Sequence, residues 1–310
     1  MDESTWLVQR FEEHRPRLRA VAYRMLGSAS ETDDAMQDAW LRLNRADTSA
    51  VENLPAWLTT VVARVCLNML RSREHRREGP LEEFGPAQAS GPAPGLGVAL
   101  GAGADSGAVV EGDPEGEALL ADSVGLALLV VLDTLAPAER LAFVLHDLFA
   151  VPFDEIGPMI ERSPAAARQL ASRARRRVKG GTAAPEADLI RQRQVVDAFL
   201  AASRGGDFEA LVALLDPEVV LRADRAAGPT PAPVVLRGAA AVARGASAAS
   251  ERVRFTQPAL VNGGVGLVMA PQGKLFLVLS FAITDGLISE IDIIADPDRL
   301  RELDLAVLDV

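Results

Sequence analysis

The sequence predicts a multidomain protein in which two all-α domains precede one α+β domain. Residues 1–78 and 119–180 carry apolar side chains at helical spacing and few glycines. Residues 188–310 begin with two helical stretches and continue with short alternating runs that are typical of β-strands. Between the helical parts, residues 79–118 are rich in Gly, Ala, Pro and acids and hold no Lys or Arg, which predicts a flexible acidic linker.

The overall composition limits the classes of protein to consider. The chain has 310 residues, 49% of them hydrophobic, so it can bury a large core. Its single cysteine excludes an internal disulfide and, with no signal peptide or membrane-spanning helix expected, indicates the cytoplasm. The formal charge of −11 argues against nucleic-acid binding by the chain as a whole, but the arginines are concentrated in a few segments.

In the first domain, Gly27 and Ser28 mark a turn, and the helix that follows is acidic on one side. Asp33, Asp34 and Asp38 lie near Trp40, so this helix suits a protein interface with an aromatic anchor inside a charged rim. The alternative is that these acids only complement the helix dipole.

The next helix begins near Pro55 and ends in the basic stretch "RSREHRR" at 71–77. An aromatic residue near its start, Trp57, followed by arginines fits a surface that stacks single-stranded bases and holds phosphates. The alternatives are a core position for Trp57 and favourable basic charge at a helix C-terminus.

A helix-turn-helix pattern occupies the end of the second helical domain. A short helix at 153–160 and a turn at 161–162 precede Ser163, an N-cap, and Pro164, at the first helical position. From 162 to 179 there are seven basic residues and no acid. Such a helix suits DNA recognition, with small residues near base edges and arginines on phosphates; the alternative is a solvated basic face.

Together these segments resemble the sigma factors of the extracytoplasmic-function type, over roughly residues 5–179. "SETDDAMQDAWLRL" is similar to the helix that binds the β′ clamp of RNA polymerase. "LPAWLTTVVARVCLNMLRSREHRR" is similar to the part that recognises and opens the −10 element, and "LAPAERLAFVLHDLFAVPFDEIGPMIERSPAAARQLASRARRRV" to the part that recognises the −35 element. The resemblance implies RNA polymerase core, through its β′ clamp and β flap, and promoter DNA as partners.

The resemblance assigns three sets of residues. Polymerase binding is expected of Asp33, Asp34, Gln37, Asp38 and Trp40. Binding of the −10 element is expected of Asn53, Trp57, Arg64, Asn68, Arg71, Arg73, Arg76 and Arg77. Binding of the −35 element is expected of Arg162, Ser163, Ala165, Ala166, Arg168, Gln169, Ser172, Arg173 and Arg176.

In the part from 188 to 310, the stretch "RQRQVVDAFLAASRGGDFEALVALLDPEVVLRAD" resembles the beginning of a SnoaL-like domain of the NTF2-like cone fold. A sigma factor fused to such a domain resembles the SigJ-type subgroup of these sigma factors. In that subgroup the extra domain takes the place of a separate anti-sigma protein and contacts the linker between the two DNA-binding parts. For this chain we expect an intramolecular contact of the extra domain with the sigma domains or the linker. The residues expected to serve regulation are Asp224, Asp296, Pro297, Asp298 and Arg299.

No cofactor, metal or catalytic activity is expected of this domain, because it contains no His, Cys, Tyr or Trp. The alternative is a small-molecule enzyme or ligand sensor of the NTF2-like type, fused to a DNA-binding half. In that case a carboxylate such as Asp224 or Asp292 would be the base.

Overall fold

The computed structural model describes residues 3–46, 51, 53–78, 125–181, 184–227, 232–250, 252–271 and 274–308. The predicted linker at 79–118 lies outside these residues. The chain forms two compact units, each treated by itself below. Of the described residues, the first unit holds those up to 78 and 132–176, and the second holds 125–131 and 177–308.

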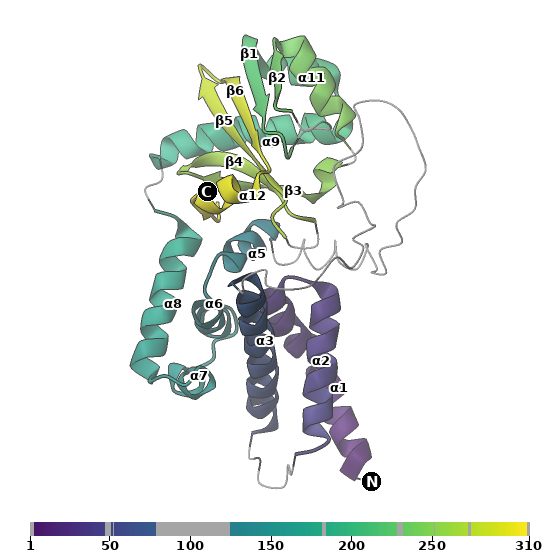
Figure 1. Ribbon diagram of the computed structural model, residues 1–310, viewed down its shortest axis with the longest axis vertical. Helices are drawn as coiled ribbons and strands as arrows, with labels where there is room; N and C mark the ends of the chain where they lie inside the picture. Colours follow the sequence, from purple (N-terminus) through teal and green to yellow (C-terminus); the bar gives the residue numbers. More distant parts are fainter. Residues whose placement is uncertain are drawn as a thin grey trace, which may run out of the picture. The chain divides into compact units, whose positions relative to one another are not determined.

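Three long helices form the beginning of the first unit, as predicted. They are α1 (Glu3–Leu26), α2 (Ala29–Leu43) and α3 (Leu54–Glu78), and each packs against the other two (Figure 1). Gly27 separates the first two with a φ of 73°, a conformation that glycine adopts at little cost. The core between them is aliphatic and includes Leu18, Met25, Leu43, Leu58 and Val62.

Four short elements and one longer helix form the end of the helical part. They are α5 (Leu126–Asp133), α6 (Pro137–Phe143), the π-helix η1 (Val144–Leu148), α7 (Phe153–Met159) and α8 (Pro164–Lys179). The predicted break before Pro137 is confirmed, since this proline occupies the first turn of α6. The π-helical turn was not predicted, because no single residue type marks it.

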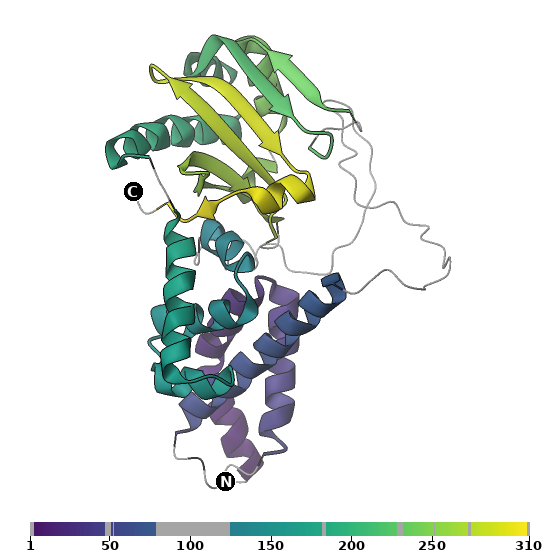
Figure 2. The ribbon, with the colours of Figure 1, turned by 60° about the vertical axis from the view of Figure 1, so that its left-hand side comes forward.

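The second unit is the α+β domain. Helices α9 (Glu186–Gly205), α10 (Phe208–Leu214) and α11 (Ala239–Ala248) pack together and against a seven-stranded sheet (Figures 1 and 2). A 3-10 turn, η2 (Arg252–Phe255), and a short helix, α12 (Pro297–Glu302), complete it. The strands are β1 (Leu215–Ala223), β2 (Val234–Arg237), β3 (Thr256–Val261), β4 (Gly264–Met269), β5 (Leu277–Thr284), β6 (Leu287–Ile294) and β7 (Leu305–Ala306).

The sheet order is β2-β1-β6-β5-β4-β3-β7. Two hairpin turns, Asn262–Gly263 and Asp285–Gly286, have positive φ at both residues, as the Asn-Gly and Asp-Gly pairs favour. The sheet is mixed, because β1 and β6 are parallel while the other neighbouring strands are antiparallel. The chain leaves the β1–β2 hairpin through α11, builds the other side of the sheet and returns beside β1 in the same direction.

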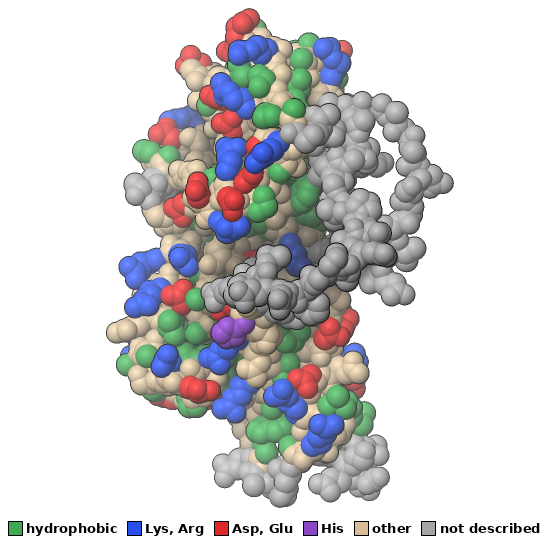
Figure 3. Space-filling view, viewed as in Figure 1, with side chains coloured by type: hydrophobic (Ala, Val, Ile, Leu, Met, Phe, Trp, Pro, Cys, Tyr) green, Lys and Arg blue, Asp and Glu red, His purple; other side chains and the backbone are tan. Residues whose placement is uncertain are grey.

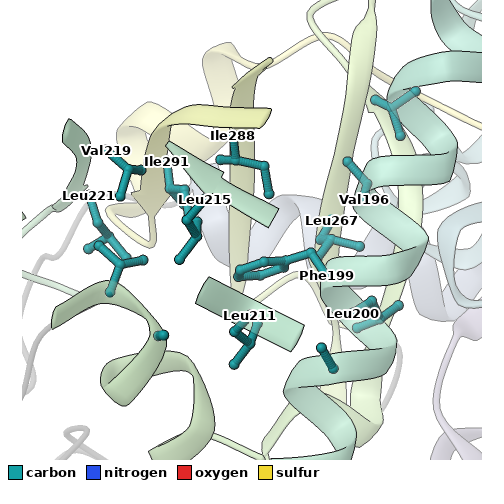
Figure 4. Packing of buried hydrophobic residues seen from close by; sticks show 14 of the residues in the cluster. Val196, Phe199, Leu200, Leu211, Leu215, Val219, Leu221, Leu267, Ile288 and Ile291 are labelled. Atoms are coloured by element: carbon teal, nitrogen blue, oxygen red, sulfur yellow. The ribbon is translucent and has the colours of Figure 1, made fainter. Parts of the chain in front are cut away.

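Side chains from α9 and α10 form the core of this unit with the sheet. Phe199 and Leu211 face aliphatic residues of the strands, among them Leu221, Leu267 and Ile291 (Figure 4). In β6 the buried Ile291 lies between the half-exposed acids Glu290 and Asp292, and its side chain faces the helices. Within the described part of the chain, the helices lack the combined length and apolar character needed to cross a bilayer.

Candidate polymerase and DNA interfaces

The acidic side of α2 is on the surface of the first unit. Asp33, Asp34 and Gln37 are exposed and Asp38 is half-exposed. Asp33 forms an ion pair with Arg19 at 3.2 Å, and Asp38 forms one with Arg42 at 3.0 Å. Both pairs are solvent-exposed, so they are weak and easily exchanged for another partner.

Trp40 connects this acidic surface to the core. Its ring lies 5.1 Å from that of Phe11, centroid to centroid, and it is half-buried. Met36 and Leu43 on the same helix are buried. An anchored aromatic ring beside exposed carboxylates has the composition of a protein interface.

The predicted −10 surface follows α3. Arg64 and Asn68, one helical turn apart, are exposed, and Trp57 is half-buried one turn before Val61. Asn53 caps the helix, since its side-chain oxygen accepts from Ala56 N at 3.1 Å. Its role in DNA binding remains a prediction.

At the basic end of α3, one of the arginine side chains is held by contacts within the protein and is therefore less available to bind DNA. Arg71 is half-exposed, whereas Arg73 forms an ion pair with Glu31 and donates to the carbonyl of Leu26 at 3.4 Å. These contacts give Arg73 a structural role, and its DNA role remains a prediction. The side chains of Arg76 and Arg77 lie outside the described residues.

Helices α7 and α8 form the predicted helix-turn-helix. Glu161 adopts a φ of 58° in the turn, and Ala166 N donates to the Ser163 hydroxyl at 3.2 Å, which caps α8. Gly157 allows the close approach of α7 to the turn, because a Cβ there would meet the Arg162 carbonyl at 2.8 Å. The predicted capping and turn are therefore confirmed.

One side of α8 is buried and the other is solvent-exposed. Ala167, Ala171, Ala174 and Val178 are buried and Leu170 is half-buried. Basic side chains are visible along the edge of the molecule that α8 forms (Figure 3). The exposed residues among those predicted to bind the −35 element are Arg162, Ser163, Ala165, Arg168, Gln169, Ser172, Arg173 and Arg176, with Ala166 half-exposed.

Two arginines of α8, Arg168 and Arg175, contact neighbouring elements. The Arg168 guanidinium lies 5.4 Å from the centroid of the Phe153 ring, a cation–π distance. Arg175, on the side away from that surface, forms an ion pair with Asp147 at 2.5 Å. Arg168 is thus oriented by α7, while Arg175 joins α8 to the π-helix.

A buried arginine that the sequence did not single out joins the two helical parts. Arg140 of α6 is 2% exposed, donates through Nε to the Arg24 carbonyl at 3.2 Å and pairs with Asp133 at 3.1 Å. Burial lowers the pKa of Arg140, and the charge of Asp133 opposes this shift. The only signal in the sequence for the burial of Arg140 is that it lies among the apolar positions of its helix.

Further contacts hold the helix-turn-helix against α1 and α3 within the first unit. Arg64 donates to the Pro158 carbonyl of α7 at 3.4 Å. Arg17 donates to the Phe149 carbonyl at 3.0 Å, and Arg24 lies 5.3 Å from the centroid of the Phe149 ring. One residue of the predicted −10 surface therefore contacts the element that positions the predicted −35 surface.

The residues predicted to serve regulation form one cluster in the second unit. The Asp224 carboxylate accepts from the backbone N–H groups of Ala295, at 3.0 Å, and Asp296, at 2.9 Å, and lies 3.4 Å from the Arg299 guanidinium. Asp296 caps α12 by accepting from Asp298 N and Arg299 N, and Pro297 occupies the first turn.

This geometry bears on the suggestion that Asp224 is a catalytic base. Burial alone would raise the pKa of Asp224, but the backbone donors of Asp296, Ala295, Ala227 and Ala226 outweigh it and hold the pKa below its ordinary value. Asp292 is half-exposed and lies 3.9 Å from Arg222. The hydrogen bonds keep the Asp224 carboxylate ionised, which favours a structural role for it.

Leu126 and Val178, near the two ends of the segment that contains the helix-turn-helix, both lie within the second unit and are hydrogen-bonded there. Leu126 N, at the start of α5, donates to the Gln257 side chain of β3 at 2.8 Å. At the other end, Val307 N donates to the Val178 carbonyl of α8 at 2.9 Å. Strands β3 and β7 are neighbours in the sheet, so one sheet edge holds both ends.

Two family models match the helical part of the chain. They are Sigma-70 region 2, over residues 10–76, and Sigma-70 region 4, over residues 125–178. The chain is 35% identical over 314 residues to the extracytoplasmic-function RNA polymerase sigma factor SigJ of Mycobacterium tuberculosis, covering 94% of this chain and 92% of that protein.

Two solved structures are also similar. The crystal structure of Mycobacterium tuberculosis SigJ matches with a TM-score of 0.44 and 31% identity, over 94% of this chain and 98% of that one. An NTF2-like protein of unknown function from Cytophaga hutchinsonii matches with a TM-score of 0.25 and 15% identity, over 36% of this chain and 95% of that one.

Proposed function

The chain belongs to the family of extracytoplasmic-function RNA polymerase sigma factors, and from this premise we propose how its parts carry out promoter recognition. The family consists of transcription initiation factors, which bind the polymerase core and promoter DNA. In this proposal α2 binds the β′ clamp, α3 binds and opens the −10 element, and α8 binds the −35 element. The helix-turn-helix domain also contacts the β flap.

The observation that carries the proposal is the exposed surface of α8. Arg168, Gln169 and Arg173 lie on it, and no acid occurs between 162 and 179. Arg and Gln form bidentate hydrogen bonds with guanine and adenine in the major groove. Arg176, further along the helix, is in place to neutralise a phosphate.

The acidic surface of α2 suits binding to the polymerase and not to DNA. Carboxylates repel DNA phosphates, so Asp33, Asp34 and Asp38 suit a basic protein surface. Because polymerase and promoter DNA meet in the cytoplasm, we place the protein there, acting without a catalytic step of its own.

We further propose that the packed arrangement of the first unit is a resting form. The −10 and −35 elements are centred about 25 base pairs apart, which is roughly 85 Å of DNA at 34–36 Å per turn. In the first unit Arg64 of α3 instead contacts Pro158 of α7. Release of the helix-turn-helix from α1 and α3 is then required before both elements can be bound.

We propose that the C-terminal domain controls that release. It holds Leu126 and Val178, the two ends of the region 4 match, through β3 and β7. A change in either strand is therefore transmitted to the ends of the helix-turn-helix domain. The direction of the effect, activation or inhibition, is decided by which form the polymerase binds.

Reconstituted transcription tests the proposal. Bacterial core polymerase with this protein is incubated with fragmented genomic DNA, and the 5′ ends of the transcripts are mapped. We expect shared motifs upstream of the start sites, and loss of those starts when Arg168 and Gln169 are both replaced by Ala. Arg244→Ala on α11, an exposed arginine of the second unit, is the control. Start sites that survive the α8 substitutions would contradict the assignment.

A further inference from the structure

The second unit contains an apolar cavity between its helices and the sheet. Its volume is about 200 Å³. The walls are formed by α9, α11 and strands β1 to β6, with Phe199, Leu221, Leu236, Met269 and Ile293 among the lining residues. This is a region where the core of the domain is not filled by its own side chains.

Two hydroxyl groups are the only polar side chains of this lining among the residues that the structure describes. They belong to Ser203 of α9 and Thr256 of β3, and each residue is 2% exposed. Neither hydroxyl oxygen has a hydrogen-bond partner within the described residues. Buried polar groups are ordinarily hydrogen-bonded, so two unpartnered hydroxyls on residues that line one apolar cavity indicate a polar ligand atom as their partner.

We propose that this cavity binds a small, uncharged and mainly apolar molecule that carries one oxygen able to hydrogen-bond to Ser203 and Thr256. A charged ligand is disfavoured, because the described lining has no charged side chain to compensate it. The size is bounded by the cavity volume, since cavities of roughly 150 Å³ lined by Leu, Ile and Phe admit benzene. A monocyclic or small bicyclic compound fits these limits.

The lining also specifies binding without catalysis. None of the lining side chains titrates near neutral pH, and the acids of β6, Glu290 and Asp292, alternate with the lining residues Ile291 and Ile293. Consecutive residues of a strand point to opposite faces, so these carboxylates lie on the face away from the cavity.

The cavity adjoins the strand that holds α5. Thr256 precedes Gln257, whose side chain accepts from Leu126 N at 2.8 Å, and the Thr256 carbonyl accepts from Arg204 at 2.7 Å. A ligand that bonds to Thr256 thus acts one residue away from the junction with the helix-turn-helix domain. The binding site itself does not rest on the proposed function.

Binding is tested with p-cresol, p-xylene and 4-methylbenzoate, which share a shape and differ in polarity and charge. Methyl chemical shifts of the full chain are followed during titration. We expect saturable shifts at Leu221 and Ile293 with p-cresol and p-xylene, and none with 4-methylbenzoate. Absence of saturable shifts with both neutral compounds, or equal binding of the benzoate, would overturn the proposal.

Matched variants locate the site. Ala246→Phe fills the cavity and is expected to weaken p-cresol at least tenfold, whereas Ala248→Phe, exposed on the same helix, leaves binding unchanged. Ala249→Leu is a second filling variant, should the first not fold as judged by its methyl spectrum. Equal effects of the substitutions at Ala246 and Ala248 would place the ligand elsewhere.

The hydroxyls are tested separately. Ser203→Ala combined with Thr256→Val is expected to weaken p-cresol roughly three- to tenfold and to leave p-xylene unchanged. Ser289→Ala, a hydroxyl outside the cavity that bonds to the Ala282 carbonyl, is the control. An equal loss for both ligands would show that the hydroxyls do not bind the ligand oxygen.

Discussion

The guanidinium of Arg140 donates to the backbone carbonyl of Arg24 over 3.2 Å, and this hydrogen bond ties α6 to the end of α1 inside the first unit. The arginine is 2% exposed and pairs with Asp133. Cys66 of α3 is fully buried, and this burial raises the pKa of its thiol to about 12. A buried charged contact of the kind that Arg140 makes is well suited to fix the register in which α6 packs on α1.

Replacing Arg140 is expected to loosen the first unit. Arg140→Met retains much of the side-chain volume but leaves the Arg24 carbonyl and Asp133 without their partner, which costs about 1–3 kcal/mol. If the packed form is a resting form, the variant also binds core polymerase several-fold more tightly. Denaturant unfolding and polymerase titration measure the two effects, with Arg193→Met, which breaks an exposed pair with Asp197 in the second unit, as control. Unchanged polymerase affinity in a destabilised variant would argue against a resting form.

Substitutions on α8 are expected to separate base contacts from phosphate contacts. Arg168→Ala or Gln169→Ala should relax base preference in the −35 element, each costing about 1–3 kcal/mol. Arg176→Ala should weaken all sequences alike and reduce the salt dependence of binding. Binding constants on a set of single-base promoter variants, at two salt concentrations, distinguish these outcomes. A uniform loss for all three variants would mean that the assigned recognition surface is wrong.

Charge reversal on α2 tests the polymerase interface. Asp38→Arg is expected to abolish holoenzyme formation, because a cation would face a basic surface, while stability changes little since the Arg42 pair is exposed. Asp197→Arg on α9, which breaks a similar exposed pair with Arg193, should leave holoenzyme formation intact. The measurement is co-elution with core polymerase, and normal co-elution of the Asp38 variant refutes the interface.

Asp224 should make the second unit sensitive to acid. Its pKa is lower in the folded state than in the unfolded chain, so its stabilising effect is complete above the unfolded value, near 3.9, and is lost as pH falls through the folded value. Asp224→Asn is therefore expected to destabilise the unit by about 1.5–3 kcal/mol at pH 7, and the difference from the natural chain should shrink in acid. Thermal unfolding from pH 7 down to pH 3 measures this, and a difference that grows in acid would contradict it.

Glycine 180 should be required at the junction between α8 and β7. Its φ is 81°, and an added Cβ would lie 2.8 Å from that of Ala306, so Gly180→Ala combines backbone strain with a steric clash. Gly206→Ala supplies the strain alone, because its φ is 63° and no atom lies within 4 Å of the added Cβ. We expect faster amide exchange at Val307, which donates to Val178, only in the Gly180 variant.

The amino-acid sequence determined the elements whose signals are local. Ser163 and Pro164 fix the start of α8, the 3.6-residue period decides which of its sides is exposed, and the Asn-Gly and Asp-Gly pairs fix two hairpins. In each case the residues that specify the structure are within a few positions of it. The exposed residues predicted to bind the −35 element follow from the same local rules.

The tertiary structure decided what depends on residues far apart in the chain. The burial of Arg140 depends on its contact with Arg24, which is far away in the sequence. The hydrogen bonds of Asp224 likewise depend on the backbone N–H groups of Ala295 and Asp296, which lie within 3.0 Å of its carboxylate only in the folded chain. The parallel β1–β6 pair and the cavity around Ser203 and Thr256 likewise arise from strands and helices that meet only on folding. Burial and hydrogen-bond partners are properties of the packed chain, and no local propensity encodes them.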